Sequence, residues 1–259
     1  MGTSDFSTSS ASAISGAYAA LGTLFQGLSS GQRINSASDD AAGLAVAEQM
    51  RGSMVDSIQA LRNLSDGTSM IQTADGAASV ISDNLIRMKE LAAQSSGGIL
   101  SIQQKEIIQR EFDQLAAENA RIAETTEFNG IKLFTQGQSI TLSIGFGNML
   151  AIQTQAIAVV SADLSNNTLS ATEVVDQAIN QLAAMRGGFG ASMNEMELAN
   201  QTLEVQVENL MAAESRIMDA DMAQETANLT ATKILAEAAM ATQAQANLSG
   251  ELVATLIRK

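Results

Sequence analysis

The side chains best suited to chemistry in this sequence are carboxylates. Two pairs stand out, Asp39 with Asp40 and Asp219 with Asp221, because hard cations such as Ca²⁺ prefer clustered oxygen ligands. Both pairs lie beside expected helix starts, where an aspartate accepts hydrogen bonds from the unpaired N–H groups of the first turn. We therefore expect helix caps at these positions and no metal site.

Three other patterns could suggest a catalytic or cofactor site. Glu195 and Glu197 are better explained as part of a solvated helix face than as a catalytic pair of carboxylates. The three methionines on the same predicted helix are better explained as core residues than as part of a cofactor site. The glycines lack the preceding strand and the lysine of a phosphate-binding loop. These residues are Glu195 and Glu197, then Met185, Met193 and Met196, and finally Gly187, Gly188 and Gly190.

Composition excludes most remaining chemistry. The 259 residues include no Cys and no His, so structural zinc and the usual nucleophile–base pairs are not expected. A formal net charge of −14 argues against a nucleic-acid partner or an anionic membrane surface. No run of 18 apolar residues suggests a membrane span, and the first basic residue, Arg33, lies too late for a cleavable signal peptide. We expect no enzyme and no cofactor.

Helical periodicity dominates the chain. Apolar or small residues recur from Met50 to Ala92 at close to the 3.5-residue spacing of a coiled-coil seam, broken only at Thr68. Ser36 and Asp39 form a capping-type pair, which predicts that this helix begins after Ser36. The absence of Pro is compatible with such a long, uninterrupted helix.

Four further elements follow. Ser-Ser-Gly-Gly at 95–98 predicts a break, and Ser101 with Gln104 predicts the start of a second helix that folds back on the first. Asn129-Gly130 is a turn dipeptide, and alternation around 139–146, including Phe146, predicts a small β element within about 128–160. Capping pairs then predict two helices, from Ser170–Glu173 and from Asp221–Gln224. This reading gives four helices and one hairpin.

The two ends of the chain carry few charges. Residues 1–32 contain one charged side chain, Asp5, and residues 222–257 contain four. A weakly charged end helix gains most by packing against copies of itself, because an isolated helix is marginal in water. The alternative is that both ends simply dock on the long helices of their own chain.

Several motifs in this order resemble the flagellins. They are LSSGQRINSASDDAAG at 28–43, LAVAEQMR at 44–51, RNLSDGTSMIQTADGA at 62–77, RMKELAAQ at 87–94, EFNGIKLF at 127–134, ESRIMDADMAQE at 214–225 and ILAEAAMATQAQAN at 234–247. The resemblance covers nearly the whole chain apart from about 135–170. The opening residues and the C-terminus depart from the family pattern.

The resemblance implies a mainly α fold: a long antiparallel helical coiled-coil rod with a small β-hairpin region and paired N- and C-terminal helices. Residues 1–39 and 219–259 would form the terminal coiled coil that lines the filament channel. Residues 40–127 and 165–218 would form the rod, and 128–164 its hairpin and short connection, without a large outer domain.

The resemblance also implies function and partners. The chain would assemble with itself into an extracellular helical filament for swimming, after export without a cleavable signal peptide. Its other partners would be the export apparatus, an export chaperone, and the filament cap and hook–filament junction proteins. A host Toll-like receptor would contact Arg87, Leu91 and Glu106; an ion pair between Arg87 and Glu106 is the simpler explanation of the two charges.

Three alternatives stay open at this point. A hook–filament junction protein shares the terminal architecture. A dimeric helical signalling rod, such as the cytoplasmic part of a chemoreceptor, and a soluble helical binding module come from other classes.

Overall fold

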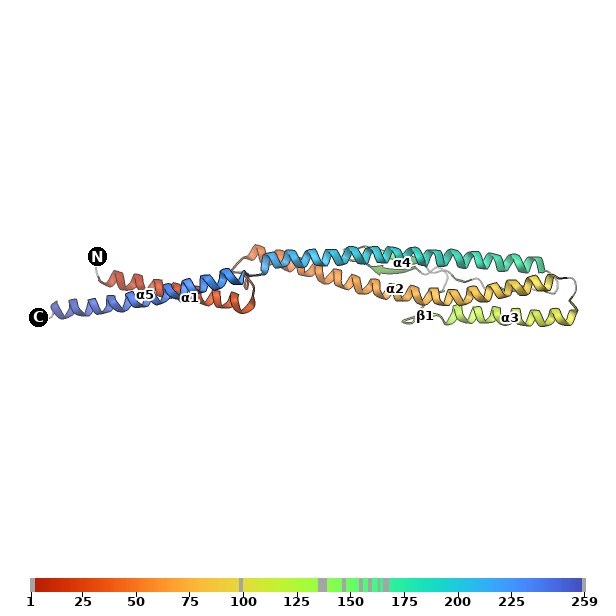
Figure 1. Ribbon diagram of the computed structural model, residues 1–259, viewed down its shortest axis with the longest axis horizontal. Coiled ribbons are helices and arrows are strands. Elements are labelled where there is room, and N and C mark those ends of the chain that lie inside the picture. Colours follow the sequence, from red (N-terminus) through yellow and green to blue (C-terminus); the bar gives the residue numbers. More distant parts are fainter. Residues whose placement is uncertain are drawn as a thin grey trace. The chain divides into compact units, whose positions relative to one another are not determined.

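Five helices and two small hairpins make up the described part of the chain (Figure 1). The computed structural model describes residues 3–97, 100–134, 139–145, 148–153, 156–157, 160–162, 164 and 168–257. The helices are α1 (Thr3–Ser30), α2 (Ala41–Ser96), α3 (Ile102–Thr125), α4 (Thr168–Met218) and α5 (Met222–Ile257). The strands are β1 (Glu127–Phe128), β2 (Ile131–Lys132), β3 (Ser139–Ser143) and β4 (Met149–Gln153). The sequence-based count of four helices and one hairpin was therefore too low.

The chain divides into two compact units. One, here called the terminal unit, comprises Met1–Met54 and Asn209–Lys259; the other, the central unit, comprises Val55–Glu208. Among the described residues, no helix is long and apolar enough to cross a lipid bilayer.

The central unit contains the main hydrophobic core. The predicted stripe on α2 is buried from Leu64 to Ala92, with Thr68 half-buried, and it packs against the apolar faces of α3 and α4. An apolar stripe on α4 is buried in the same core. Its most buried members are Val175, Leu182, Phe189 and Met196.

The start of α3 agrees with the sequence prediction. The Ser101 side chain accepts a hydrogen bond from the Gln104 N–H at 3.3 Å, and the Gln104 side chain accepts one from the Ser101 N–H at 2.9 Å. Both halves of the capping box are present. The predicted break after α2 is confirmed, because that helix ends at Ser96.

Two predicted helix starts were wrong. The long helix α2 begins at Ala41, since Asp40 and not Ser36 accepts the first-turn bond, from Gly43 N–H to Oδ1 at 2.8 Å. Ser36 instead closes a turn with Asp39. Similarly, α4 begins at Thr168, so Ser170 lies inside its first turn and not ahead of it.

The β elements are two separate antiparallel hairpins. The Asn129-Gly130 dipeptide joins β1 to β2 with positive φ at both residues, +51° and +78°, as a type I′ turn requires. Strand β3 pairs with β4, with Thr141 opposite Ala151 and Ser143 opposite Met149. The predicted alternation is confirmed for the described strand residues; Phe146 lies outside them.

In the terminal unit, α1 and α5 lie side by side and antiparallel (Figure 1). The segments that follow α1 and precede α5 are joined by backbone hydrogen bonds, from Arg33 N–H to the Met218 carbonyl at 2.6 Å and from Ala220 N–H to the Gly31 carbonyl at 2.9 Å. Ile34, Ala47 and Met218 form a small second core in this unit.

Candidate assembly surfaces

Three aspartates of the two acidic pairs, Asp39, Asp40 and Asp221, accept hydrogen bonds from backbone N–H groups. Asp40 caps α2, and Asp221 caps α5 by accepting from Ala223 N–H at 2.9 Å and Gln224 N–H at 3.2 Å. The N–H groups of Ser36 and Asn35 hold the pKa of Asp39 below its ordinary value. Asp219 accepts from the Ser215 hydroxyl. Within the described residues, no cluster of acidic side chains is arranged to hold a metal ion.

The remaining candidates have structural positions. Glu195 and Glu197 are exposed on α4, two residues apart and so on different sides of the helix. Met185 and Met196 are buried in the core, as predicted. The helix α4 continues unbroken through its glycines, and a Cβ atom at Gly187, Gly188 or Gly190 would meet no atom within 4 Å.

The three residues carried over as receptor contacts differ in exposure. Arg87 is half exposed and pairs with Glu111 at 2.8 Å and Glu90 at 2.9 Å, so its partner is not Glu106. These two carboxylates raise the pKa of the Arg87 guanidinium, Glu111 most strongly. Glu106 is exposed on α3, whereas Leu91 is only 1% exposed and belongs to the core.

Helices α1 and α5 meet along a heptad seam. On α1 the half-buried positions are Ile14, Ala17, Leu21, Leu24 and Leu28. On α5 the less exposed positions follow the 3-4 spacing of a coiled coil and, apart from Leu229, are small or polar: Glu225, Leu229, Thr232, Ala236, Ala239, Gln243, Ala246 and Gly250. Of the described side chains in this pair, only Gly27 and Ala236 reach full burial.

A second heptad seam runs along the opposite face of α5, which is exposed. We call it the outer seam: Ala227, Ala231, Ile234, Ala238, Ala241, Gln245, Leu248 and Leu252. It contains no charged residue, and Ile234, Leu248 and Leu252 are each more than half exposed. Several larger apolar side chains of α5 therefore lie on the face away from α1, whereas Leu229 lies in the inner seam and Met240 contacts Tyr18 of α1 at 3.3 Å. Spacing alone could have revealed this seam, because it repeats at 3-4 intervals like the inner one.

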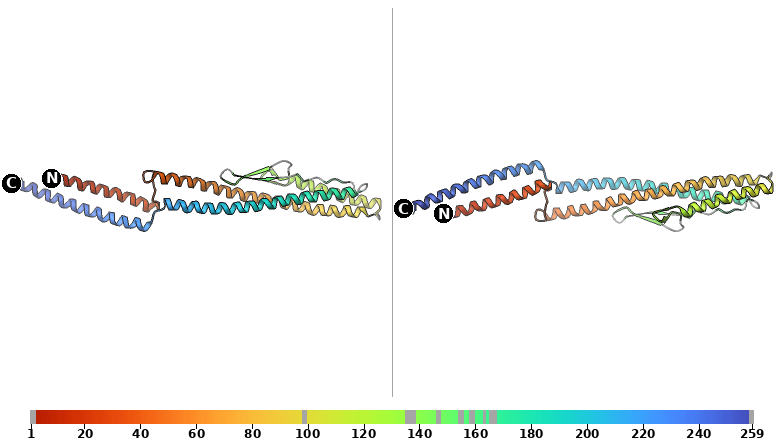
Figure 2. Two further views of the ribbon diagram at one scale, coloured as in Figure 1. Left: turned by 90° about the horizontal axis from the view of Figure 1, so that it is seen from above. Right: turned by 90° about the horizontal axis from the view of Figure 1, so that it is seen from below.

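The hairpin β3–β4 rests on α2 in the central unit (Figure 2). A Cβ atom at Gly67 would overlap the Leu142 side chain of β3, which would have to shift, and would lie 3.1 Å from the Met196 sulfur. Asn63 donates a hydrogen bond from Nδ2 to the Ser143 carbonyl at 3.0 Å. No local sequence pattern predicts this contact between the hairpin and α2, because the residues that form it are about 75 to 130 positions apart in the chain.

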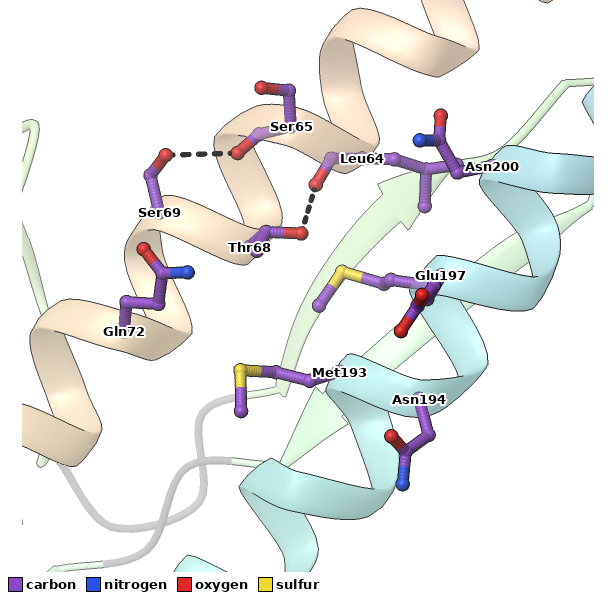
Figure 3. A pocket seen from close by; sticks show the side chains of 10 residues that line it. Leu64, Ser65, Thr68, Ser69, Gln72, Met193, Asn194, Glu197 and Asn200 are labelled. Carbon is purple, nitrogen blue, oxygen red and sulfur yellow. Dashed lines mark hydrogen bonds between the residues drawn. The ribbon is translucent and has the colours of Figure 1, made fainter. Parts of the chain in front are cut away.

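Beside the same stretch of α2 lies a groove of about 590 Å³ between α2 and α4. Met193 and Met196 both line it; Figure 3 shows Met193 reaching from α4 toward α2, with the strands of the hairpin passing behind the two helices. The other lining residues are Leu64, Ser65, Thr68, Ser69, Gln72, Asn194, Glu197 and Asn200.

These features define a helical structural subunit: one well-packed unit and a pair of terminal helices whose apolar side chains are left in solvent. Comparison with known proteins agrees. Residues 6–139 match the bacterial flagellin N-terminal helical region, and residues 172–256 match the bacterial flagellin C-terminal helical region.

Individual relatives support the same family. The chain is 41% identical over 244 residues to a flagellin of Halalkalibacterium halodurans, covering 89% of each chain. It is 35% identical to a flagellar filament core protein of Treponema maltophilum, covering 89% of this chain and 90% of that one. A crystal structure of Bacillus cereus flagellin superposes with a TM-score of 0.51 at 25% identity, covering 59% of this chain and 94% of that chain.

The chain therefore belongs to the bacterial flagellin family. It is a structural subunit of the extracellular flagellar filament, and the relatives favour this role over that of a junction protein.

Proposed function

We propose that this subunit assembles through its terminal helices, with the outer seam of α5 buried against helices of neighbouring copies. The observation that carries the proposal is the exposed, uncharged second seam, which repeats at coiled-coil spacing along α5. A helix with two heptad seams can pack against a partner on each side, and α1 occupies only one of them.

The free energy gained by burying apolar side chains also favours assembly through the outer seam. Full burial of a leucine side chain is worth roughly 1.5–3 kcal/mol, and a lone chain leaves Leu248 and Leu252 mostly in water. Copies of an acidic protein repel one another, so a seam without charge is the surface on which they can approach most closely.

The first prediction tests this seam. Leu248→Glu places a charge in the outer seam, and burying that charge between copies costs free energy. We expect the critical concentration for filament formation to rise at least about tenfold, because a loss of about 1.4 kcal/mol in the free energy of association corresponds to a factor of ten. Sedimentation of seeded filaments over a concentration series measures it.

The matched control is Ala244→Glu. Position 244 lies seven residues from both Glu237 and Glu251, on a side of α5 that already carries charge, so the added charge should leave assembly nearly unchanged. Equal effects of the two substitutions would contradict a specific role for the outer seam.

The finer domain layout belongs to the same proposal. Residues 1–39 and 219–259 would line the filament channel, 40–127 and 165–218 would form the surrounding rod, and 128–164 would form the hairpin and short connecting region of the rod, without a large outer domain. Export by the flagellar export apparatus, with the help of a chaperone, would precede assembly between the junction and cap proteins. Family membership supports these assignments.

We also propose that a host Toll-like receptor contacts the surface around Arg87 and Glu106, with Leu91 supporting that surface from the core beneath. The second prediction is that Arg87→Ala or Glu106→Ala weakens binding of a soluble receptor ectodomain to the monomer at least about fivefold, about 1 kcal/mol. Arg62→Ala, an exposed arginine elsewhere on α2, serves as control. Unchanged affinity in both test variants, or no binding by the parent protein, would exclude the proposal.

A further inference from the structure

The β3–β4 hairpin belongs to a long stretch of chain without charge. Residues 133–162 contain no Asp, Glu, Lys or Arg, although the whole protein carries a net charge of −14. Two copies of such an acidic subunit avoid mutual repulsion only where uncharged surfaces meet. The hairpin is therefore the part of the central unit best suited to a contact between copies.

Among its described side chains, the hairpin presents a single large apolar one to solvent. Leu142, Leu150 and Ile152 pack toward the helices, so the alternate residues face outward. Of these, Thr141, Ser143 and Ala151 are small, whereas Met149 is large and 71% exposed. Among the described residues of this outward face, Met149 therefore projects furthest into solvent.

The groove lies at the same level of α2 but opens on another side. Asn63 and Gly67 contact the hairpin, while their neighbours Leu64 and Thr68 line the groove. In Figure 3 the hairpin passes behind the pair of helices that bounds the groove.

The lining suits an unbranched apolar side chain. Leu64, Met193 and Met196 supply flexible apolar surface, hydroxyl and amide groups surround them, and Glu197 is the only charged residue among those that line the groove.

We propose that the outward face of the β3–β4 hairpin of one copy, centred on Met149, docks in the α2–α4 groove of a second copy. The inference rests on the proposed self-assembly and names a contact for it within the central unit. Because the projection and the groove are different surfaces of the same subunit, the contact is head-to-tail. Contacts of that kind generate helical polymers when the rotation between successive copies does not close a ring.

The third prediction uses the absence of cysteine from the chain. Met149→Cys and Ser69→Cys are combined in one chain, both at exposed positions, and filaments of this variant are mildly oxidised and examined on a non-reducing denaturing gel. We expect a ladder of covalent oligomers, because every copy is linked to the next. Filaments of either single variant should stay monomeric on the gel.

Co-assembly gives a second readout. Filaments made from equal amounts of the two single variants should yield covalent dimers and no longer species, since each copy then carries one thiol. Met149→Cys combined with Gln103→Cys, an exposed position on α3, is the matched control and should give no ladder.

The outcomes separate the two proposals. Filaments that form without a ladder, or with dimers from Met149→Cys alone, would overturn the head-to-tail contact and leave the outer seam untouched. Failure of the parent protein to form filaments would overturn the proposed function itself.

Discussion

At the scale of single residues, the position of the β3–β4 hairpin depends on the lack of a side chain at Gly67. Gly67 lies inside α2, where glycine costs about 1 kcal/mol of helix stability relative to alanine. The contact with Leu142 and Met196 explains why glycine stands there, because a Cβ atom would overlap the leucine. Gly76, further along the same helix, has open space around it and no such role.

The fourth prediction compares these two glycines. Gly76→Ala should raise the free energy of unfolding by about 0.5–1 kcal/mol through helix propensity alone. Gly67→Ala should lower it by roughly 1 kcal/mol, because overpacking at the hairpin outweighs that gain. Urea denaturation of the monomer, followed by circular dichroism, measures both changes.

Hydrogen exchange locates the effect. In Gly67→Ala the loss of protection should be greatest in β3 and β4, whereas the C-terminal part of α2, and α3, should keep their protection. Equal stabilisation by the two alanines would mean that the hairpin does not need glycine at this position.

At the scale of elements, the sequence predicts what depends on neighbours along the chain. The capping box Ser101–Gln104 and the turn Asn129-Gly130 are as predicted because all their hydrogen bonds join residues within three or four positions. The start of α2 was placed too early because Ser36, Asp39 and Asp40 are all good caps. Only the backbone decides which one is used.

Contacts between distant elements are less predictable. The apolar stripe on α2 predicts a buried face but does not identify what covers each part of it: α3, α4 or the hairpin. The residues of α2 that line the groove and those that contact the β3–β4 hairpin both lie between Ala60 and Gln72. The sequence of this stretch alone does not indicate which residues belong to which contact. The receptor candidate Leu91 illustrates the same limit, because its burial follows from packing across helices.

At the scale of the whole molecule, the two units differ in how much apolar surface they bury. The central unit has a continuous core contributed by α2, α3, α4 and the β3–β4 hairpin. In the α1–α5 pair, large side chains such as Phe25, Leu235 and Leu252 are more than half exposed. Stability is therefore uneven along the chain, and the weakest elements are those that gain most from assembly.

The fifth prediction follows from this difference. In the monomer, α1 and α5 should exchange their amide hydrogens at least about a hundredfold faster than α2 between residues 64 and 92, since local opening of a poorly buried pair costs several kcal/mol less. Proteolysis should likewise begin before about residue 35 and beyond about residue 220. In the filament, both measurements should show strong protection of α1 and α5, because neighbouring copies now cover the outer seam.

The central unit provides the internal control, because its α2 segment should be protected equally in monomer and filament. Leu248→Glu monomers should match the parent protein, so that any change in protection comes from contacts between copies. If α1 and α5 were already as protected as α2 in dilute monomer, they would be stable without neighbours. Burial of the outer seam would then not drive assembly. The contact between the β3–β4 hairpin and the α2–α4 groove would have to supply most of the filament's stability.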